Sequence, residues 1–190
     1  MCLKSVNYFL NFLRNLYLLM LAKNALVMYA NKMKINLLSA FGAFLCITAL
    51  AYLNGLQGGS LWLIPPFGAS MVLVMAVHES PLAHPKNILF GHIFSALSGV
   101  LVYMLFGYSP VSIGIAVALA IFVMMTTKTV HPPAGANPII AVVGAKGLTF
   151  VLMPVAIGAS FIVLFAIIYN RLLKRKYFTF KDWNQLLNSK

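Results

Sequence analysis

An apolar stretch without a single charge runs for 21 residues from Asn36 to Leu56, long enough to cross a hydrocarbon core of roughly 30 Å as a helix. Hydrophobic residues make up 62% of the chain and charged residues only 8%, which is far from the balance of a soluble domain. Helices suit such runs because they satisfy their own backbone hydrogen bonds in lipid. We therefore predict an all-α membrane protein of about six transmembrane or half-spanning helices, the others at 61–77, 88–107, 110–127, 131–147 and 148–169.

Two short motifs interrupt these apolar runs at matching places. Residues 65–70 read Pro-Pro-Phe-Gly-Ala-Ser, and residues 132–137, sixty-seven positions later, read Pro-Pro-Ala-Gly-Ala-Asn. At the same offset Gly91 corresponds to Gly158, so the likeness continues into the next apolar run. Paired Pro-Gly interruptions in the two halves of a membrane chain indicate an internal repeat with a site at its interface.

The charge is strongly one-sided, with a net value of +12 and only two acidic residues, Glu79 and Asp182. The basic residues lie at the two ends of the chain and singly between the apolar runs. This is the positive-inside pattern of a membrane protein and not the basic face of a nucleic-acid-binding protein. We therefore expect the lipid bilayer as a partner, no nucleic acid, and both termini in the cytoplasm, with the bacterial inner membrane as the location.

The same rule bears on the number of crossings. Six crossings put the uncharged loops at 54–60 and 107–110 outside, and Lys86, Lys128 and the basic tail inside. If residues 131–147 instead formed a re-entrant segment, five crossings would place the tail outside, against the rule. Six crossings divide into three per repeat, and an odd number inverts the second repeat relative to the first. The prediction is a three-plus-three inverted repeat.

The first 35 residues form a separate element. On a helix, polar side chains including Lys4, Asn11 and Arg14 fall on one face, and large apolar side chains fall on the other. Such a basic amphipathic helix is typical of a segment lying in the membrane interface. The expected organisation is this segment at 1–35, a transmembrane domain at 36–173 and a basic cytoplasmic tail at 174–190.

The two motifs carry a chemistry that suits an anion. Proline is favoured at the start of a helix, where free backbone N–H groups carry the positive end of the helix dipole. Two such ends meeting near the bilayer midplane would hold a small anion, with glycines allowing close approach. The alternative is that Pro and Gly merely serve helix packing. The predicted substrate-binding residues are Pro66, Phe67, Gly68, Ala69, Ser70, His131, Pro132, Pro133, Ala134, Gly135, Ala136 and Asn137.

Four further polar residues are candidates for a pathway or gate: Glu79, Asn87, His92 and Lys128. An ionisable group inside a membrane span, such as His92, is a functional candidate, although satisfied packing explains it equally well. His131 could line a pathway mouth or cap a helix. The spacing of His78, Glu79 and His84 does not match a metal site. No catalytic residue and no cofactor are expected, because acids are scarce and no nucleophile elbow occurs.

Three blocks of sequence resemble the HPP family of integral membrane proteins. They are residues 66–70, residues 80–87 and the string His131-Pro132-Pro133-Ala134-Gly135-Ala136-Asn137, and the resemblance covers about residues 36–173. His84, Lys86 and Asn137-Pro138 depart from the family pattern. The resemblance implies four spans, which conflicts with the six expected here from charge and repeat. It also implies nitrite as a substrate, since plastid and cyanobacterial relatives are associated with nitrite transport.

These observations favour a transporter or channel for a small inorganic anion, with nitrite as the substrate that the resemblance implies. The alternative is a membrane scaffold or sensor module without transport activity, in which the motifs only pack helices. An enzyme is disfavoured because acids and bases are scarce inside the apolar runs. A homo-oligomer is left open.

Overall fold

The computed structural model describes residues 2–56 and 63–178, with side chains at residue 14 and from residue 17 onward. Throughout the described residues the chain is helical or in turns, and it forms the predicted all-α membrane protein. It divides into two compact units, Met1–Ala40 and Phe41–Lys190. The helix α1, Cys2–Leu56, is continuous across this division. The polar stripe predicted for residues 4–15 falls almost wholly outside the described side chains.

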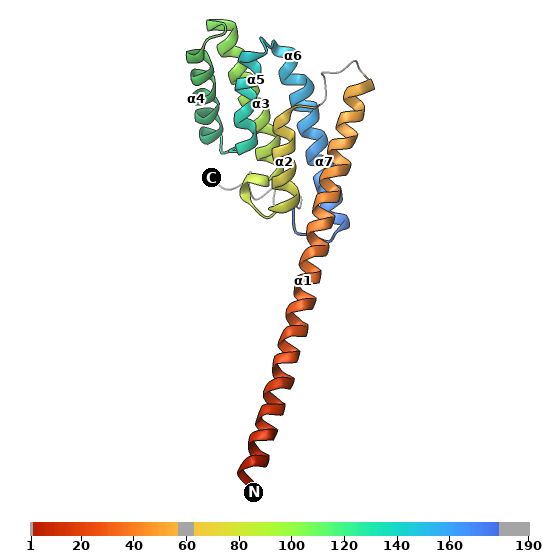
Figure 1. Ribbon diagram of the computed structural model, residues 1–190. Coiled ribbons are helices and arrows are strands. Elements are labelled where there is room, and N and C mark those ends of the chain that lie inside the picture. Colours follow the sequence, from red (N-terminus) through yellow and green to blue (C-terminus); the bar gives the residue numbers. More distant parts are fainter. Residues whose placement is uncertain (1, 57–62, 179–190) are drawn as a thin grey trace. The chain divides into compact units, whose positions relative to one another are not determined.

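The second unit is a bundle built from α1 after Phe41 and from the elements that follow it. These are α2 (Pro65–Ala76), η1 (Pro81–Ala83), α3 (Pro85–Phe106), α4 (Pro110–Thr126), η2 (Pro132–Ala136), α5 (Asn137–Val143), α6 (Leu148–Phe150), η3 (Val151–Ala156) and α7 (Ile157–Leu172). The short η1 and η2 are 3₁₀-helices, and η3 is a π-helix that contains Pro154. Successive segments run in opposite directions along the bundle, with η2–α5 and α6–η3–α7 each acting as one segment (Figure 1).

Proline marks the first residue of several helices, as helix-start chemistry requires. Pro65, Pro85 and Pro110 open α2, α3 and α4. The cap residue before Pro110 is Ser109, whose Oγ accepts the N–H of Ser112 at 3.0 Å. Helix α3 ends at Phe106, and the next residue, Gly107, has a φ of +65°, a value that favours glycine.

Among the residues that the structure describes, three helices are long and apolar enough to cross a membrane: Tyr17–Gly55, Pro85–Phe106 and Leu148–Leu172. Helices α2 and α4 are apolar but shorter, with 12 and 17 residues. The predicted span at 131–147 is instead a broken segment, a five-residue 3₁₀-helix followed by the seven-residue α5. At about 1.5 Å per residue, α2 is near 18 Å long, about half of a hydrocarbon core. Helix α2 and the η2–α5 segment are therefore the half-spanning members of the predicted set.

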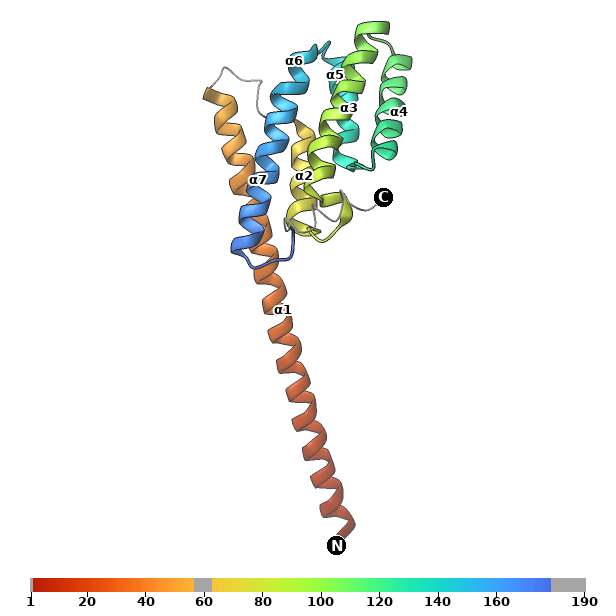
Figure 2. The same ribbon diagram turned by 180° about the vertical axis from the view of Figure 1, so that it is seen from behind.

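Helix α3 lies at the centre of the bundle, with α4 on one side and α7 on the other in both views (Figures 1 and 2). Its buried face carries small residues, including Ser95, Ala96, Ser98 and Gly99. An added Cβ on Gly99 would lie only 2.6 Å from the Cα of Pro138 in α5. Small residues allow helices to approach closely where lipid supplies no hydrophobic driving force between them.

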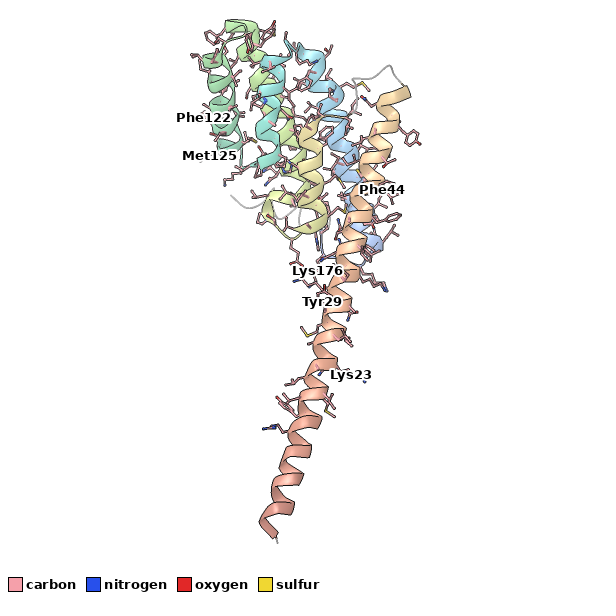
Figure 3. The ribbon with its side chains drawn as sticks, viewed as in Figure 1. Lys23, Tyr29, Phe44, Phe122, Met125 and Lys176 are labelled. Atoms are coloured by element: carbon pink, nitrogen blue, oxygen red, sulfur yellow. The ribbon has the colours of Figure 1, made fainter. Side chains whose placement is uncertain are left out.

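Large apolar side chains cover the outer surface of the bundle. Phe122 and Met125 on α4 are 67% and 64% exposed, and they point outward (Figure 3). Leu105 on α3, Val111 on α4 and Leu152 on η3 are similarly exposed. An apolar surface of this extent would aggregate in water, and it fits contact with lipid tails.

The loops at one end of the bundle meet. The loop between α2 and α3 approaches the linker before η2, where the carbonyl oxygen of Leu82 lies 2.9 Å from Nδ1 of His131. The loop between α2 and α3 also contacts the chain after α7, because the hydroxyl of Tyr177 donates to the carbonyl oxygen of Ala83 at 2.9 Å. Most of the charged residues between the helices lie in these loops.

Candidate functional site in the bundle interior

A set of fully buried polar side chains lies where the two Pro-Pro motifs meet. We call Ser70, His92, Ser95, His131 and Asn137 the buried polar cluster; each has an exposed fraction of 0%. Helix α2 supplies the first, α3 the next two, the linker before η2 the fourth, and α5 begins with the last. Polar groups buried away from water are costly unless they are hydrogen-bonded. The arrangement of these bonds therefore decides what the cluster can do.

The hydroxyl of Ser70 is the centre of the cluster. Its Oγ lies 2.8 Å from Nε2 of His92 and 2.8 Å from Nε2 of His131. A third neighbour is the carbonyl oxygen of Pro66 at 3.2 Å, one helical turn earlier in α2. The two imidazole rings are packed edge to face, with centroids 5.0 Å apart. One oxygen atom thus joins two rings that come from different parts of the chain.

The hydrogen-bond partners of His131 determine which ring nitrogen carries the proton when the ring is neutral. Its Nδ1 faces the carbonyl oxygen of Leu82, which can only accept, so Nδ1 carries the proton and donates. In the neutral ring Nε2 is then an acceptor, and the hydroxyl of Ser70 donates to it. His131 is the N-cap residue of η2 but makes no side-chain cap bond, so side-chain capping, one of the two roles considered for it, is not found.

The side-chain amide of Asn137 determines the tautomer of His92. Its Nδ2 lies 3.1 Å from the carbonyl oxygen of His92 and 3.0 Å from Oγ of Ser95. Because that carbonyl can only accept, the NH₂ group must face it. The same Nδ2 is 3.0 Å from Nδ1 of His92, so Nδ1 accepts and the ring proton is on Nε2. His92 therefore donates to Ser70.

These assignments form one directed chain of hydrogen bonds. The amide of Asn137 donates to His92, His92 to the Ser70 hydroxyl, Ser70 to His131, and His131 to the carbonyl of Leu82. Every donor in it has an acceptor in the neutral state. The chain leads from the bundle interior to the loop between α2 and α3.

One acceptor of the cluster is left over. The Oδ1 atom of Asn137 is buried and has no hydrogen-bond partner in the described part of the chain. Its amide nitrogen is already used, so this side chain offers an acceptor and not a donor. A water molecule or a ligand that donates a hydrogen bond fits this position.

Two neighbours shape the cluster. The ring of Phe67 packs edge-on against His92 with centroids 5.3 Å apart. Gly91, next to His92 on α3, lets the linker pass closely. An added Cβ there would lie 2.8 Å from both the Cβ of His131 and the carbonyl oxygen of Thr129. Neither contact leaves room for a larger residue at position 91.

The backbone of the motifs differs from the predicted pair of free helix ends. Both motifs begin with two prolines, which have no N–H to offer. The amide of Phe67 donates to Ile64 at 3.0 Å, and that of Ala134 donates to His131 at 2.9 Å. The backbone N–H of Asn137 donates to the carbonyl of Ala134. These three backbone donors are therefore used locally, and the groups that contact the Ser70 hydroxyl from α3 and the linker are side chains.

The two motif glycines also differ from expectation. An added Cβ on Gly68 or Gly135 would meet no atom of the described chain within 4 Å. The close backbone approach expected at these glycines is not found here. It occurs instead at Gly91 and Gly99, where an added Cβ would lie 2.8 Å from the carbonyl oxygen of Thr129 and 2.6 Å from the Cα of Pro138. A role for Gly68 and Gly135 beside a ligand stays a prediction.

The predicted site residues fall into three classes of burial. Ser70, His92, His131 and Asn137 form the cluster, with Pro66, Phe67 and Ala134 buried beside or near it; Asn87, Pro133, Gly135 and Ala136 are half-buried; Gly68, Ala69, Glu79, Lys128 and Pro132 are exposed. Of the four pathway candidates, His92 alone belongs to the cluster. Asn87 instead donates to the carbonyl of Pro81 at 3.0 Å.

Sequence reasoning missed Ser95 and the carbonyl of Leu82. Ser95 lies three residues after His92, on the same face of α3, and this spacing could have identified it. No side-chain pattern marks a backbone carbonyl as a partner, so Leu82 could not have been found in this way.

The polar side chains of the loop between α2 and α3 are not part of the cluster, which contacts this loop through the carbonyl of Leu82. Burial, and then the charge of Arg175, lowers the pKa of His78, while Glu79 opposes this change. Within the described ranges, no three His, Cys, Asp or Glu side chains are grouped so as to hold a metal ion.

Comparison with known proteins places this architecture in a family. The family model described as "HPP, transmembrane region" matches residues 28–178. The chain belongs to the HPP transmembrane family. It is an integral membrane protein, and the resemblance seen in the sequence is confirmed.

Two proteins of Dictyostelium discoideum described as transmembrane proteins are similar to this chain. One is 37% identical over 74% of this chain and 48% of its own length, and the other is 31% identical over 77% of this chain and 54% of its own length. The chain thus spans about half the length of these curated relatives. No solved structure matches it. The source of both relatives gives no support to the bacterial membrane expected from the sequence.

Proposed function

We propose that this HPP-family chain is a membrane transporter or channel for a small inorganic anion, and that the buried polar cluster is its binding site. The observation that carries the proposal is the position of Ser70 Oγ, 2.8 Å from Nε2 of both His92 and His131. Two ring nitrogens aimed at one oxygen in a buried setting form a site that an anionic oxygen can occupy.

The binding mode follows from the donors. When the Ser70 side chain turns away, an oxygen of the anion takes the place of its hydroxyl oxygen. It receives the Nε2–H of His92 and, once His131 is protonated, a second N–H from that ring. Such charge-assisted bonds are roughly twice as strong as neutral ones. The unpartnered Oδ1 of Asn137 suits a water that enters with the anion.

The arrangement of the bundle supports a transport role through an inverted repeat. At the offset of sixty-seven residues, the bounds of α2 (Pro65–Ala76) correspond to those of η2 and α5 together (Pro132–Val143). These two half-length segments run in opposite directions (Figure 1). Short, broken segments from two inverted halves that meet at a polar site are typical of secondary transporters.

Nitrite is the first substrate to test, because the family resemblance implies it. The purified chain in proteoliposomes is given nitrite, nitrate, formate and chloride, and uptake is compared with that of protein-free liposomes. We expect uptake of at least one small oxyanion, above the background, that saturates with concentration. Inertness toward every anion, from a chain that is folded and inserted, would instead favour the scaffold or sensor function, in which the cluster only joins helices.

A further inference from the structure

The hydrogen bonds around Ser70 provide for two protonation states of His131. In the neutral state the Ser70 hydroxyl donates to Nε2 of His131. If Nε2 gains a proton, that nitrogen becomes a donor, and the hydroxyl must find another acceptor. The carbonyl oxygen of Pro66, 3.2 Å away, is already in place. A small rotation about the C–O bond of Ser70 therefore satisfies both states.

His92 lacks such an alternative. Its Nδ1 accepts from the Asn137 amide, and that amide cannot turn over without placing Oδ1 against the carbonyl oxygen of His92, 3.1 Å away. Its Nε2 already carries the ring proton. A proton gained by His92 would therefore have to bind Nδ1. There it would face the side-chain NH₂ group of Asn137, and two donors would oppose each other. The pair of rings is thus unequal, and His131 is the one that can accept a proton.

We propose that His131 is the proton-carrying residue of this transporter, and that one proton bound at its Nε2 accompanies each anion through the chain. This inference rests on the proposed anion transport. The added proton forms an N–H bond at Nε2, and the Ser70 hydroxyl turns to Pro66; an oxygen of the entering anion then replaces the Ser70 oxygen as the acceptor of both ring N–H groups. The cationic ring pairs with the anion, so the loaded cluster has no net charge from the two. When the anion leaves, the proton leaves with it, and the hydroxyl turns back.

The position of the cluster suits exchange of protons with one side. His92 lies seven residues after Pro85, about 10 Å along a helix near 33 Å long at about 1.5 Å per residue. Nδ1 of His131 contacts the loop between α2 and α3, where Leu82 is half-buried. His131 is therefore close to the end of the bundle at which the loops meet.

The charged and titratable groups around His131 provide no other candidate for the proton-carrying residue in the cluster. Helix α2 contributes only the Ser70 hydroxyl to the cluster, α3 contributes His92, and α5 contributes the neutral Asn137. On the linker, Lys128 is exposed three residues before His131. The neighbouring loop carries His78, Glu79 and His84, and Lys86 is the second residue of α3. The chain after α7 brings Tyr177 to the carbonyl of Ala83. Among described residues no acidic side chain contacts the cluster.

Proton and anion movement are measured separately in one preparation. Proteoliposomes contain a trapped pH-sensitive dye, and anion uptake is followed chemically while the membrane potential is clamped. For the unmodified chain we expect an inward proton gradient to accelerate anion uptake, with acidification of the interior at one proton per anion beyond protein-free liposomes. Anion uptake that ignores the proton gradient would overturn the inference and leave the transport proposal standing. Absence of anion uptake under all gradients would overturn both.

Two variants test which of the two histidines carries the proton. His131→Gln keeps a hydrogen-bonding side chain but cannot carry a proton, so the gradient should no longer accelerate its uptake. His92→Gln is the matched variant: uptake should slow, but the proton-to-anion ratio should remain that of the unmodified chain. A ratio unchanged in His131→Gln, or lost only in His92→Gln, would overturn the assignment. If His131→Gln does not insert, Ser70→Ala serves instead, because it removes the hydroxyl that exchanges partners, and the gradient response should weaken.

Discussion

Ser70 Oγ and His131 Nε2 lie 2.8 Å apart although 61 positions separate them in the chain. Ser70 ends the first Pro-Pro motif and His131 directly precedes the second, so this single hydrogen bond joins the two motif regions inside the bundle. Neither residue has an exposed surface. A bond of this kind costs free energy when either partner is removed, because the other is left buried and unpaired.

The glycines that matter for packing are predicted to be Gly91 and Gly99. Alanine at either position would force backbone or side-chain atoms apart by several tenths of an ångström, which typically costs about 1–3 kcal/mol. Gly68→Ala and Gly135→Ala are the matched controls, since nothing in the described chain lies within 4 Å of the added methyl group. Thermal unfolding in detergent measures the difference. Equal loss of stability in all four variants would contradict the packing found here.

Asn137 is predicted to matter more for uptake than Lys128. Asn137→Ala removes the amide that holds His92 and Ser95 in place, leaving buried groups unpaired at a cost of about 1–3 kcal/mol, or up to about a hundredfold in affinity. Lys128 is exposed, so Lys128→Ala should slow uptake modestly and only at low ionic strength. Anion uptake at several salt concentrations separates the two effects. Loss of all activity in Lys128→Ala, with normal uptake by Asn137→Ala, would move the site to the charged loops.

A pH effect is expected outside the bundle core at Tyr177. Burial raises the pKa of its hydroxyl, which donates to the carbonyl of Ala83. Below the ordinary tyrosine pKa of about 10 the hydroxyl is protonated in both states, and its contribution to stability is complete. As the pH rises above about 10, the unfolded chain loses this proton first, so the contribution declines. The stability difference between the unmodified chain and Tyr177→Phe should therefore shrink from pH 8 to pH 11; a constant difference would contradict this.

The sequence was sufficient for the fold class because long uncharged runs can only be spanning helices in lipid. It also located Ser70, His131 and Asn137, since they follow or flank prolines that start helical segments. It was less able to identify which backbone groups stay free. Phe67 and Ala134 use their amides in local turns, and a motif does not reveal this. Gly91 and Gly99 were missed as packing positions because the segments that press on them come from distant parts of the chain.

The orientation in the membrane stays a prediction of the charge pattern. The loops at 77–84 and 127–131 meet the chain after α7 at one end of the bundle, so they should share one side of the membrane. With Cys2 and Cys46 replaced, single cysteines at Ser5→Cys and Ser189→Cys can be labelled with an impermeant thiol reagent in intact cells. We expect protection of both until the cells are opened. Labelling of Ser189→Cys alone in intact cells would refute the six-crossing arrangement and the inverted repeat.

The most direct test of the binding site compares two serines that each lie within hydrogen-bond distance of a carbonyl oxygen one turn earlier in a helix. Ser70 lies in the buried polar cluster, whereas Ser160 on α7 is exposed and bonds only to Ala156. Initial rates of anion uptake are measured for Ser70→Ala and Ser160→Ala in matched proteoliposomes with equal amounts of inserted protein. Transport through the cluster predicts a loss of about tenfold or more in Ser70→Ala, as one lost buried bond implies, and an unchanged rate in Ser160→Ala. Equal rates in the two variants would contradict the assignment of the anion site to the cluster.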